Sequence, residues 1–401
     1  MSRRVAITGA GTVNALAPDV PGTLAALTEG RVAIGPMVFE EIERLSVKIG
    51  AQIKDWDAEA HFTRQEISLY DRAVQFAVEA GRQAVAQAGL SLTEAESLRA
   101  GVVMGTGGGG YTTIDDSYRA VHAQGKNRVH PFTIPRLMHN AAAAHLAMRH
   151  GLKGPAFTVS TACASSNHAM GLAFQMVRSG ASDVMLTGGA EATLCFGGLK
   201  AWEGLRVMSP DGCRPFCASR NGMVQGEGAA VFVFEDMDRA RARGAQILAE
   251  VAGFAMSSDA GDIVMPDPDG AARAMQGALD DAGLAPEAVG YINAHGTATT
   301  ANDRSEAQAI RAVFDTPPPV SATKSMHGHL LGAAGAVELL ALLLALGDGV
   351  IPPTAGWREE DPELLGLDVV PNEARRARVD AALSNAFAFG GMNACLALRR
   401  A

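Results

Sequence analysis

One cysteine, Cys163, stands where a short strand-like run meets a helical pattern. The run 157–160 has strand character, and small residues follow it before a helical stretch without proline. Free N–H groups and the dipole at the start of a helix favour the thiolate, which is the reactive form of cysteine. Cys163 is therefore a candidate nucleophile, and the alternative is a buried small hydrophobic residue, which is what most free cysteines are.

Two histidines and a lysine are candidate partners for such a nucleophile. His295 lies in the sequence His-Gly-Thr and His329 in Gly-His-Leu, and both follow strand-like or glycine-rich segments. A cysteine nucleophile needs a basic or proton-managing group, which a histidine facing a pocket supplies. Lys324 can hold a carboxylate or fix a neighbouring histidine. The alternatives are histidines satisfied by backbone hydrogen bonds and a solvated surface lysine.

The two regions that carry these residues resemble each other. Val159-Ser160-x-x-Cys163 and Val320-Ser321-x-x-Lys324 each stand before a long helical pattern, which suggests a duplicated βα unit. A charged stretch over 236–245 is the best candidate boundary. We therefore predict two halves, 1–245 with the cysteine and 246–401 with the two histidines.

Two long apolar patterns predict helices that pack around these segments. Residues 65–90 have helical spacing and end at Gly89. The apolar stretch Leu330–Leu346 is interrupted by Glu338 and is too short to span a bilayer comfortably. We interpret it as a buried helix and expect no transmembrane segment.

Composition excludes several classes of function. The chain has 401 residues and a net charge of −9, which argues against a nucleic-acid partner. Five cysteines are an odd number, so a disulfide framework is not expected and a reducing cytoplasm is favoured. Cys213 and Cys217 lack a second ligand pair for zinc, and the N-terminus lacks the pattern of a signal peptide.

Two glycine-containing segments do not match nucleotide-binding motifs. The run 5–11 looks like the opening of a dinucleotide fold, but Asn14 stands where the third glycine is needed. Gly105-Thr106-Gly107-Gly108-Gly109-Gly110 is followed by Tyr111, whereas a phosphate loop continues with Lys-Ser or Lys-Thr. The glycine run therefore predicts a close backbone approach or space for a ligand.

Four motifs in order extend the interpretation beyond spacing. They are Thr161-Ala162-Cys163-Ala164-Ser165, Asn293-Ala294-His295-Gly296-Thr297, Lys324-Ser325-Met326-x-Gly328-His329-x-x-Gly332-Ala333-Ala334-Gly335 and Phe389-Gly390-Gly391-Met392-Asn393. Over essentially the whole chain, this set resembles the β-ketoacyl-[acyl-carrier-protein] synthases of type II, which are condensing enzymes. The resemblance implies a thiolase-like duplicated α/β fold with α-β-α-β-α layers, a homodimer, and no metal or cofactor.

The resemblance also implies an acyltransferase reaction with named roles. Cys163 would take an acyl group from the phosphopantetheine arm of an acyl-carrier protein. His295 and His329 would hold the malonyl thioester while CO₂ leaves, and the resulting carbanion would attack the acyl group, a decarboxylative Claisen condensation. Backbone N–H groups of Cys163 and Phe389 would form the oxyanion hole, and Lys324 with Glu338 would support the histidines.

Further residues are assigned to substrate binding by the same resemblance. Thr297 and Thr299 match positions that bind the pantetheine arm, and Phe389 matches a gating phenylalanine. Gly108 replaces a bulky residue and implies a deeper acyl pocket. The residues expected to contact the carrier protein are Arg206, Lys126 and Arg128.

Departures from the general pattern resemble the nodulation protein E branch of the family. Asn221 and His327 replace the usual Asp and Thr. Two other specialisations remain open, an inactive chain-length-factor-like partner and a polyketide-type ketosynthase; inactive partners typically lose the nucleophile that Cys163 retains. A biosynthetic thiolase is disfavoured, because Cys395 lies beyond the C-terminal Phe-Gly-Gly motif.

Overall fold

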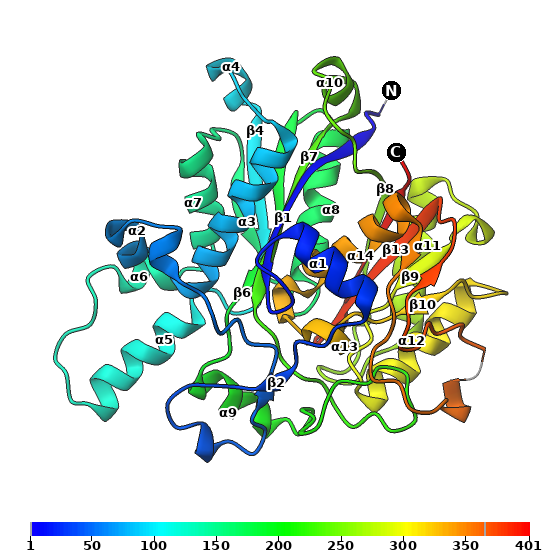
Figure 1. The fold of residues 1–401 in the computed structure, drawn as a ribbon. Coiled ribbons are helices and arrows are strands. Elements are labelled where there is room, and N and C mark those ends of the chain that lie inside the picture. Colours follow the sequence, from blue (N-terminus) through cyan, green and yellow to red (C-terminus); the bar gives the residue numbers. More distant parts are fainter. Residues whose placement is uncertain (1, 365) are drawn as a thin grey trace.

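Ten strands form one mixed sheet in the computed structural model, which describes residues 2–364 and 366–401 (Figure 1). Their order across the sheet is β10-β9-β13-β14-β8-β1-β7-β6-β4-β5. The strands are β1 (Val5–Asn14), β4 (Ala100–Gly105), β5 (Ala156–Val159), β6 (Val184–Glu191), β7 (Gly228–Asp236), β8 (Ala249–Ser258), β9 (Tyr291–Asn293), β10 (Val320–Ser321), β13 (Ala381–Ala388) and β14 (Met392–Arg399).

The sheet contains the same five-stranded pattern twice. In the first half β4 runs parallel to β5 and β6, and β7 runs antiparallel to β6 and β1. In the second half β9 runs parallel to β10 and β13, and β14 runs antiparallel to β13 and β8. The predicted duplication is confirmed, and β5 and β10, which precede Cys163 and Lys324, occupy equivalent places.

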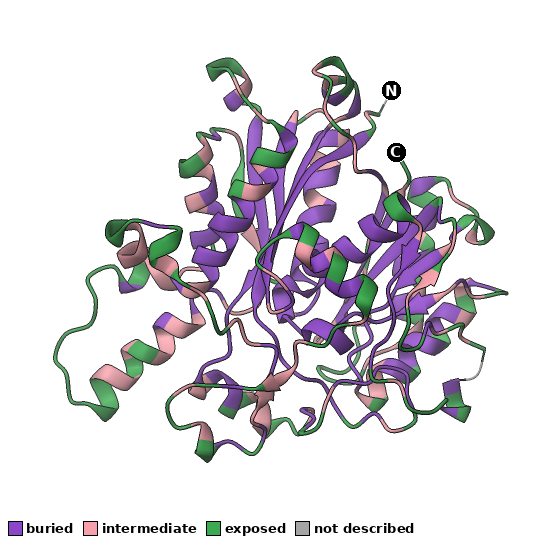
Figure 2. Cartoon of the chain, viewed as in Figure 1, coloured by how far each residue is buried: buried purple, intermediate pink, exposed green. Residues whose placement is uncertain are grey.

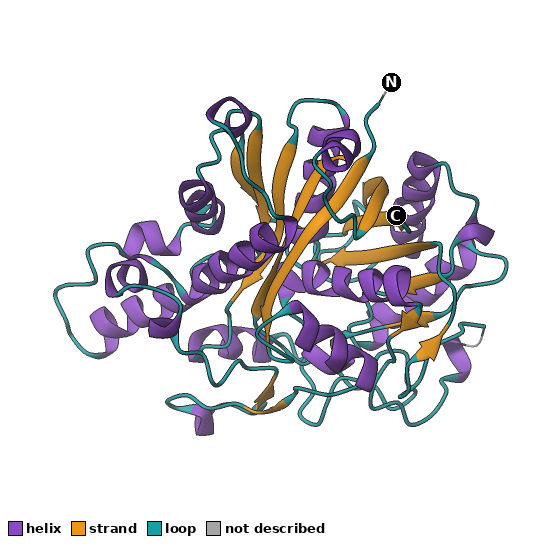
Figure 3. Cartoon of the chain, turned by 45° about the horizontal axis from the view of Figure 1, so that its top comes forward, coloured by secondary structure: helices purple, strands orange, loops and turns teal. Residues whose placement is uncertain are grey.

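Helices lie between the two groups of strands and outside both, which gives the expected α-β-α-β-α layers (Figure 3). Neighbouring residues of one strand face different layers: Phe232 and Leu396 pack in the central core, whereas Val231 and Cys395 pack in the outer ones. The layers consist of α3 (Arg72–Ala88) and α7 (Ala141–His150), then α8 (Ser165–Arg178) and α14 (Ala334–Asp348), then α11 (Pro268–Ala282) and α12 (Thr300–Val313).

The buried apolar helix is confirmed as the central helix α14, which follows the short 3₁₀ turn η5 (Leu331–Ala333). By length and composition Leu331–Asp348 is apolar enough to cross a membrane, but 89% of this window is buried inside the protein. Figure 2 shows the strands and the central helices as the buried interior. The hydrophobicity of α14 therefore serves the core, where it packs against α8 and both groups of strands.

The predicted helix over 65–90 is wrong as a single element, because it is two helices. The first is α2 (Arg64–Leu69), and α3 begins anew after Asp71, whose side chain accepts a hydrogen bond from the N–H of Ala73. An aspartate at this position starts a helix by satisfying a free N–H group. The predicted end at Gly89 is confirmed, since Gly89 has a left-handed backbone with φ of 56°.

The two halves are joined by β1, which pairs with β7 on one side and with β8 on the other. The candidate boundary 236–245 coincides with α10 (Met237–Ala242), and the division into 1–245 and 246–401 stays a prediction. The remaining elements are α1 (Val20–Glu29), α4 (Glu94–Ser97), α5 (Tyr111–Tyr118), η3 (Arg119–Ala123), α6 (Thr133–Leu137), α9 (Phe196–Gly204), α13 (Lys324–His327), short 3₁₀ turns and the strand pairs β2 (Gly35–Pro36) with β3 (Ile49–Gly50) and β11 (Val350–Ile351) with β12 (Arg375–Arg376).

Candidate active site

Cys163 lies in a tight turn between the end of β5 and the start of α8, as the sequence predicts. Ala162 has a φ of 47°, a left-handed conformation that costs a residue with a side chain some strain. Ser165 Oγ stabilises the turn by accepting a hydrogen bond from Thr161 N at 2.9 Å and donating one to Ala162 O at 2.6 Å. Strained turns of this kind are frequent where a side chain is presented to a substrate.

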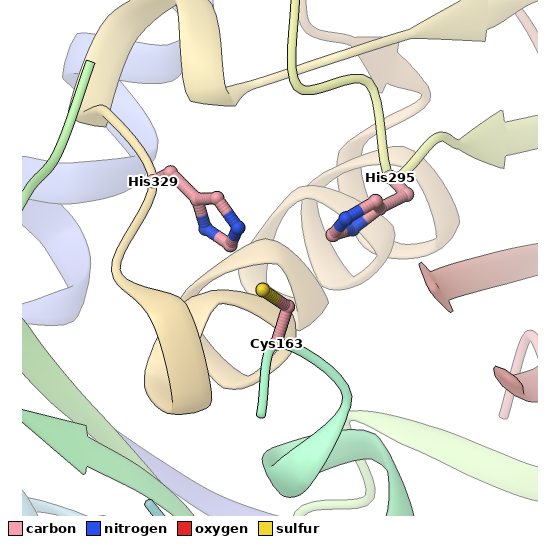
Figure 4. Close-up of side chains that lie close together, drawn as sticks. All are labelled: Cys163, His295 and His329. Carbon is pink, nitrogen blue, oxygen red and sulfur yellow. The ribbon is translucent and has the colours of Figure 1, made fainter. Parts of the chain in front are cut away.

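The structure brings Cys163, His295 and His329 together from three separate segments (Figure 4). The sulfur and one ring nitrogen of each histidine lie within 4.8 Å of one another. The two imidazole rings are 5.4 Å apart between centroids and nearly perpendicular, at 82°. All three residues are buried, with exposed fractions of 7%, 2% and 1%.

Hydrogen bonds fix the tautomers of both histidines. Leu331 N donates to His329 Nδ1 at 3.1 Å, and Lys324 Nζ lies 3.3 Å from His295 Nδ1. A backbone N–H group and a lysine ammonium can only donate, so Nδ1 is the acceptor in both rings. The proton of each neutral imidazole is therefore on Nε2, and the site holds two N–H donors of the same kind.

Burial and a nearby cation keep both imidazoles neutral. The pKa values of His295 and His329 lie well below the ordinary histidine range, because the rings are desolvated and the Lys324 ammonium opposes a second positive charge. Lys324 itself is fully buried and donates to Glu338 Oε1 and to the carbonyl oxygen of His295, both at 2.5 Å. The lysine thus fixes the ring and the backbone of His295.

The start of α8 is expected to favour the thiolate of Cys163, but burial has a larger effect on this thiol in the opposite direction. Burial raises the pKa of the Cys163 thiol to about 12, and the Lys324 cation offsets this only in part. Desolvation destabilises a buried thiolate more than the helix dipole and the Lys324 cation stabilise it. Cys163 is therefore a thiol beside two neutral imidazoles.

A cavity of about 710 Å³, which includes space open to solvent, leads to this cluster. Cys163, His295 and His329 line it together with Thr297 and Thr299. The hydroxyls of the two threonines are 2.8 Å apart and hydrogen-bonded to each other.

Aromatic and apolar side chains form the outer part of the cavity. Phe389, directly after β13, stacks on Trp202 with ring centroids 6.0 Å apart. The segment 262–266 also lines the cavity, and its Ile263 and Met265 are 72% and 59% exposed. Exposed apolar side chains at the opening suit a ligand with apolar parts.

Two family models match consecutive parts of the chain. Residues 2–240 match the "Beta-ketoacyl synthase, N-terminal domain", and residues 248–358 match the "Beta-ketoacyl synthase, C-terminal domain". The chain belongs to the β-ketoacyl synthase family. It is a condensing enzyme of the acyltransferase type, as the four motifs predict.

Curated β-ketoacyl synthase relatives cover the full length of the chain. Nodulation protein E of Rhizobium leguminosarum bv. trifolii is 47% identical over 100% of both chains. A 3-oxoacyl-[acyl-carrier-protein] synthase 2 from Synechocystis is 39% identical and spans 99% of this chain and 98% of its own. The predicted resemblance to the nodulation protein E branch is confirmed.

Solved ketosynthases share the fold of this β-ketoacyl synthase. "The ishigamide ketosynthase/chain length factor" has a TM-score of 0.95 at 37% identity, with all of both chains covered. A β-ketoacyl synthase from Burkholderia phymatum has a TM-score of 0.92 at 34% identity, again over both whole chains. The thiolase-like fold predicted from the motifs is confirmed.

The remaining predicted residues lie apart from the cluster of this β-ketoacyl synthase. Gly108 is not among the residues that line the described cavity, and its N–H group instead donates to Glu191 Oε1 at 3.0 Å. Arg206 is exposed next to Val207, which does line the cavity. Lys126 and Arg128 line a different surface groove together with Arg136.

The sequence analysis does not predict three features of this region. Trp202 and the segment 262–266 reach the cavity only through the tertiary fold. Glu306 on α12 accepts hydrogen bonds from the N–H groups of His295 and Gly296, both at 2.8 Å. An acidic residue in an otherwise partly buried helical stretch is the one signal for it, because a buried carboxylate needs donors.

Proposed function

We propose that this enzyme condenses an acyl group held on Cys163 with a malonyl group on an acyl-carrier protein and releases 3-oxoacyl-carrier protein and CO₂. The observation that carries the proposal is the buried cluster of one thiol and two neutral imidazoles with matching tautomers. Such a site supplies a nucleophile and two N–H donors for a developing oxyanion.

The first half-reaction loads the enzyme. Cys163 Sγ attacks the acyl thioester carbonyl, the bond from that carbon to the pantetheine sulfur breaks, and the leaving thiolate takes up the proton that Sγ loses. Backbone N–H groups of Cys163 and Phe389 hold the oxyanion of the tetrahedral intermediate. Because the thiol does not ionise unaided at neutral pH, its proton moves to the leaving thiolate as the new carbon–sulfur bond forms.

The second half-reaction forms the carbon–carbon bond. His295 and His329 donate their Nε2–H groups to the malonyl thioester carbonyl, the carbon–carboxylate bond breaks, and CO₂ leaves an enolate. The enolate carbon attacks the acyl carbonyl on Cys163, and the bond from that carbonyl to Sγ breaks. The released Sγ thiolate then takes up one proton from solvent, which the overall condensation consumes. Lys324 and Glu338 are positioning residues that keep His295 in place and uncharged.

The substrate path follows the cavity outward. Thr297 and Thr299 hold the pantetheine arm, and Phe389 gates the entrance against Trp202. An acyl-carrier protein complex of a type II polyketide ketosynthase with 27% identity and a TM-score of 0.91 supports a carrier-protein partner. Arg206, Lys126 and Arg128 are the proposed contacts with its acidic surface.

The enzyme is proposed to act in the cytoplasm as a homodimer that pairs along the edge strand β5. This strand is the last of the sheet, and Phe157 on it is 37% exposed. A related heterodimer is the alternative, since one solved neighbour is a ketosynthase in complex with its chain length factor. Because the chain has Cys163, we propose that it is the catalytic subunit in either assembly. The relatives in the nodulation protein E branch support a specialised acyl chain.

Intact-protein mass spectrometry with acyl-carrier proteins tests the nucleophile. Incubation without malonyl donor should add one acyl group to the wild-type protein, and Cys163→Ala should remove this adduct while the protein stays folded. Cys395→Ala is the matched control, because Cys395 is also a buried free cysteine but packs in an outer core. Acylation that survives in Cys163→Ala, or is lost in Cys395→Ala, would contradict the proposal.

A further inference from the structure

A buried carboxylate, that of Glu191, lies against the glycine run after β4, and the condensation reaction does not explain it. Glu191 is the last residue of β6 and is fully buried. In the described part of the chain, Glu191 forms no ion pair with a lysine, arginine or histidine. A buried carboxylate without a cation is costly unless hydrogen-bond donors surround it.

Donors from two separate segments surround this carboxylate. From the glycine run, Gly107 N donates to Oε2 at 2.7 Å, Gly108 N to Oε1 at 3.0 Å and Thr106 Oγ1 to Oε1 at 3.2 Å. From the turn after His329, Gly332 N donates to Oε2 at 3.0 Å. Successive backbone N–H groups that converge on one anion form a nest.

The glycines are required because the carboxylate lies where their side chains would be. A Cβ on Gly332 would be 2.7 Å from Glu191 Oε2 and 2.2 Å from Gly107 N. A Cβ on Gly107 or Gly108 would lie 3.2 Å from one of the carboxylate oxygens. The predicted close backbone approach is therefore an approach between two loops and one carboxylate.

The nest lies directly behind the reacting groups. A Cβ on Gly107 would be 3.8 Å from the carbonyl oxygen of Ala162, the residue before the nucleophile. Gly332 follows Leu331, whose N–H group holds His329 Nδ1. One carboxylate thus joins the turn after His329 to a glycine run that lies beside the residue before Cys163.

We propose that Glu191 is a positioning residue whose ionised carboxylate fastens the glycine run to the turn after His329 and places an uncompensated negative charge behind Cys163. The role in condensation rests on the proposed function. Burial raises the pKa of Glu191 to about 7, so its carboxyl group is mainly ionised at pH 8. This charge opposes ionisation of the thiol, in addition to the larger effect of burial on the Cys163 pKa. The free enzyme thereby keeps its nucleophile unreactive toward oxidants and alkylating agents.

Two substitutions at the same position separate the charge from the fastening. Glu191→Gln removes the charge, whereas Glu191→Asp keeps it but is one methylene too short to reach both loops. Alkylation of Cys163 by iodoacetamide at pH 8 should become about tenfold faster in Glu191→Gln, which corresponds to a one-unit fall in thiol pKa. The rate should stay within twofold of wild type in Glu191→Asp. Both variants should lose at least about tenfold in malonyl decarboxylation.

Glu306→Gln is the matched control, because Glu306 is an equally buried carboxylate held by backbone N–H groups. Its alkylation rate should equal that of wild type. A purely structural Glu191 would predict a lower melting temperature with unchanged alkylation in Glu191→Gln, which would overturn the proposal; so would equal acceleration in Glu191→Asp or in Glu306→Gln. Alkylation needs no substrate, so the charge effect is tested even if the proposed reaction is wrong.

Discussion

Cys163 and Lys324 occupy equivalent places in two halves that fold alike, but the chain continues differently after each. After Cys163 the central helix α8 begins at once, at Ser165. After Lys324 the segment 325–333 comes before α14 begins at Ala334, and this segment carries His329. The same strand-to-helix frame thus presents a buried thiol in one half, and in the other a buried cation followed by a buried imidazole.

In each half, a buried carboxylate also holds the loop that follows β4 or β9. Glu191 binds the N–H groups of Gly107 and Gly108 after β4, and Glu306 binds those of His295 and Gly296 after β9. Burial raises the pKa of both carboxyl groups to about 7, against the effect of these donors. In both halves a buried carboxylate holds a loop by its N–H groups. The loop is a glycine run in the first half and carries His295 in the second.

Lys324→Met removes the cation from the second half and should have the largest effect on stability. Glu338 would be left as a buried charge without a partner, which costs about 3–5 kcal/mol in the free energy of unfolding. Chemical denaturation measures this loss. The double variant Lys324→Met, Glu338→Leu should regain most of the stability without regaining condensation. A double variant that condenses normally would show that the pair has no role in positioning His295.

His295→Ala and His329→Ala test whether the second half contributes only to the malonyl step. Each should lower decarboxylation by about 10²–10³, the usual effect of removing one oxyanion donor, while acylation of Cys163 stays within a few-fold of wild type. His122→Ala, an exposed histidine on η3, serves as the control. Equal loss of both half-reactions would contradict the assignment of His295 and His329 to the malonyl step.

Glu306→Gln should change how stability depends on pH. The carboxyl group has a pKa of about 7 in the folded protein, above its ordinary value of 4.5, so the folded state keeps a proton that the unfolded state releases. Glu306 therefore lowers the free energy of unfolding progressively as pH rises from 4.5 to 7, by about 3 kcal/mol in all. Melting temperatures between pH 4.5 and 7 should fall less steeply in the variant. An unchanged slope would mean that this carboxyl group ionises normally.

The candidate site follows from the sequence because its members stand at local signals. Cys163, His295 and Lys324 come directly after short strand-like runs, and those runs are the observed β5, β9 and β10. Convergence does not follow from these signals alone, since it depends on the order of strands in the sheet. The four motifs supply that order through the resemblance.

Other features depend on tertiary contacts that no local pattern contains. Asp71 divides the expected helix because it caps α3 and also accepts hydrogen bonds from the N–H and hydroxyl groups of Thr113, far along the chain. The thiol form of Cys163 follows from its burial, which its small neighbours do not predict. Gly108 is expected to leave room for the acyl chain, but a Cβ at this position would lie 3.0 Å from Tyr111 Cδ2 and 3.2 Å from Glu191 Oε1.

The position of β1 has a consequence for how the chain reaches this structure. Its residues Val5, Ala6 and Ile7 pair on one side with β7 and on the other with β8, so a strand that precedes all of its partners in the chain joins the two groups of strands in a seam. This seam cannot close before residues 249–251 are available, and contacts between such distant segments slow folding. The halves therefore depend on each other as they fold, and residues 1–245 alone would expose an unpaired edge of β1, a site for aggregation.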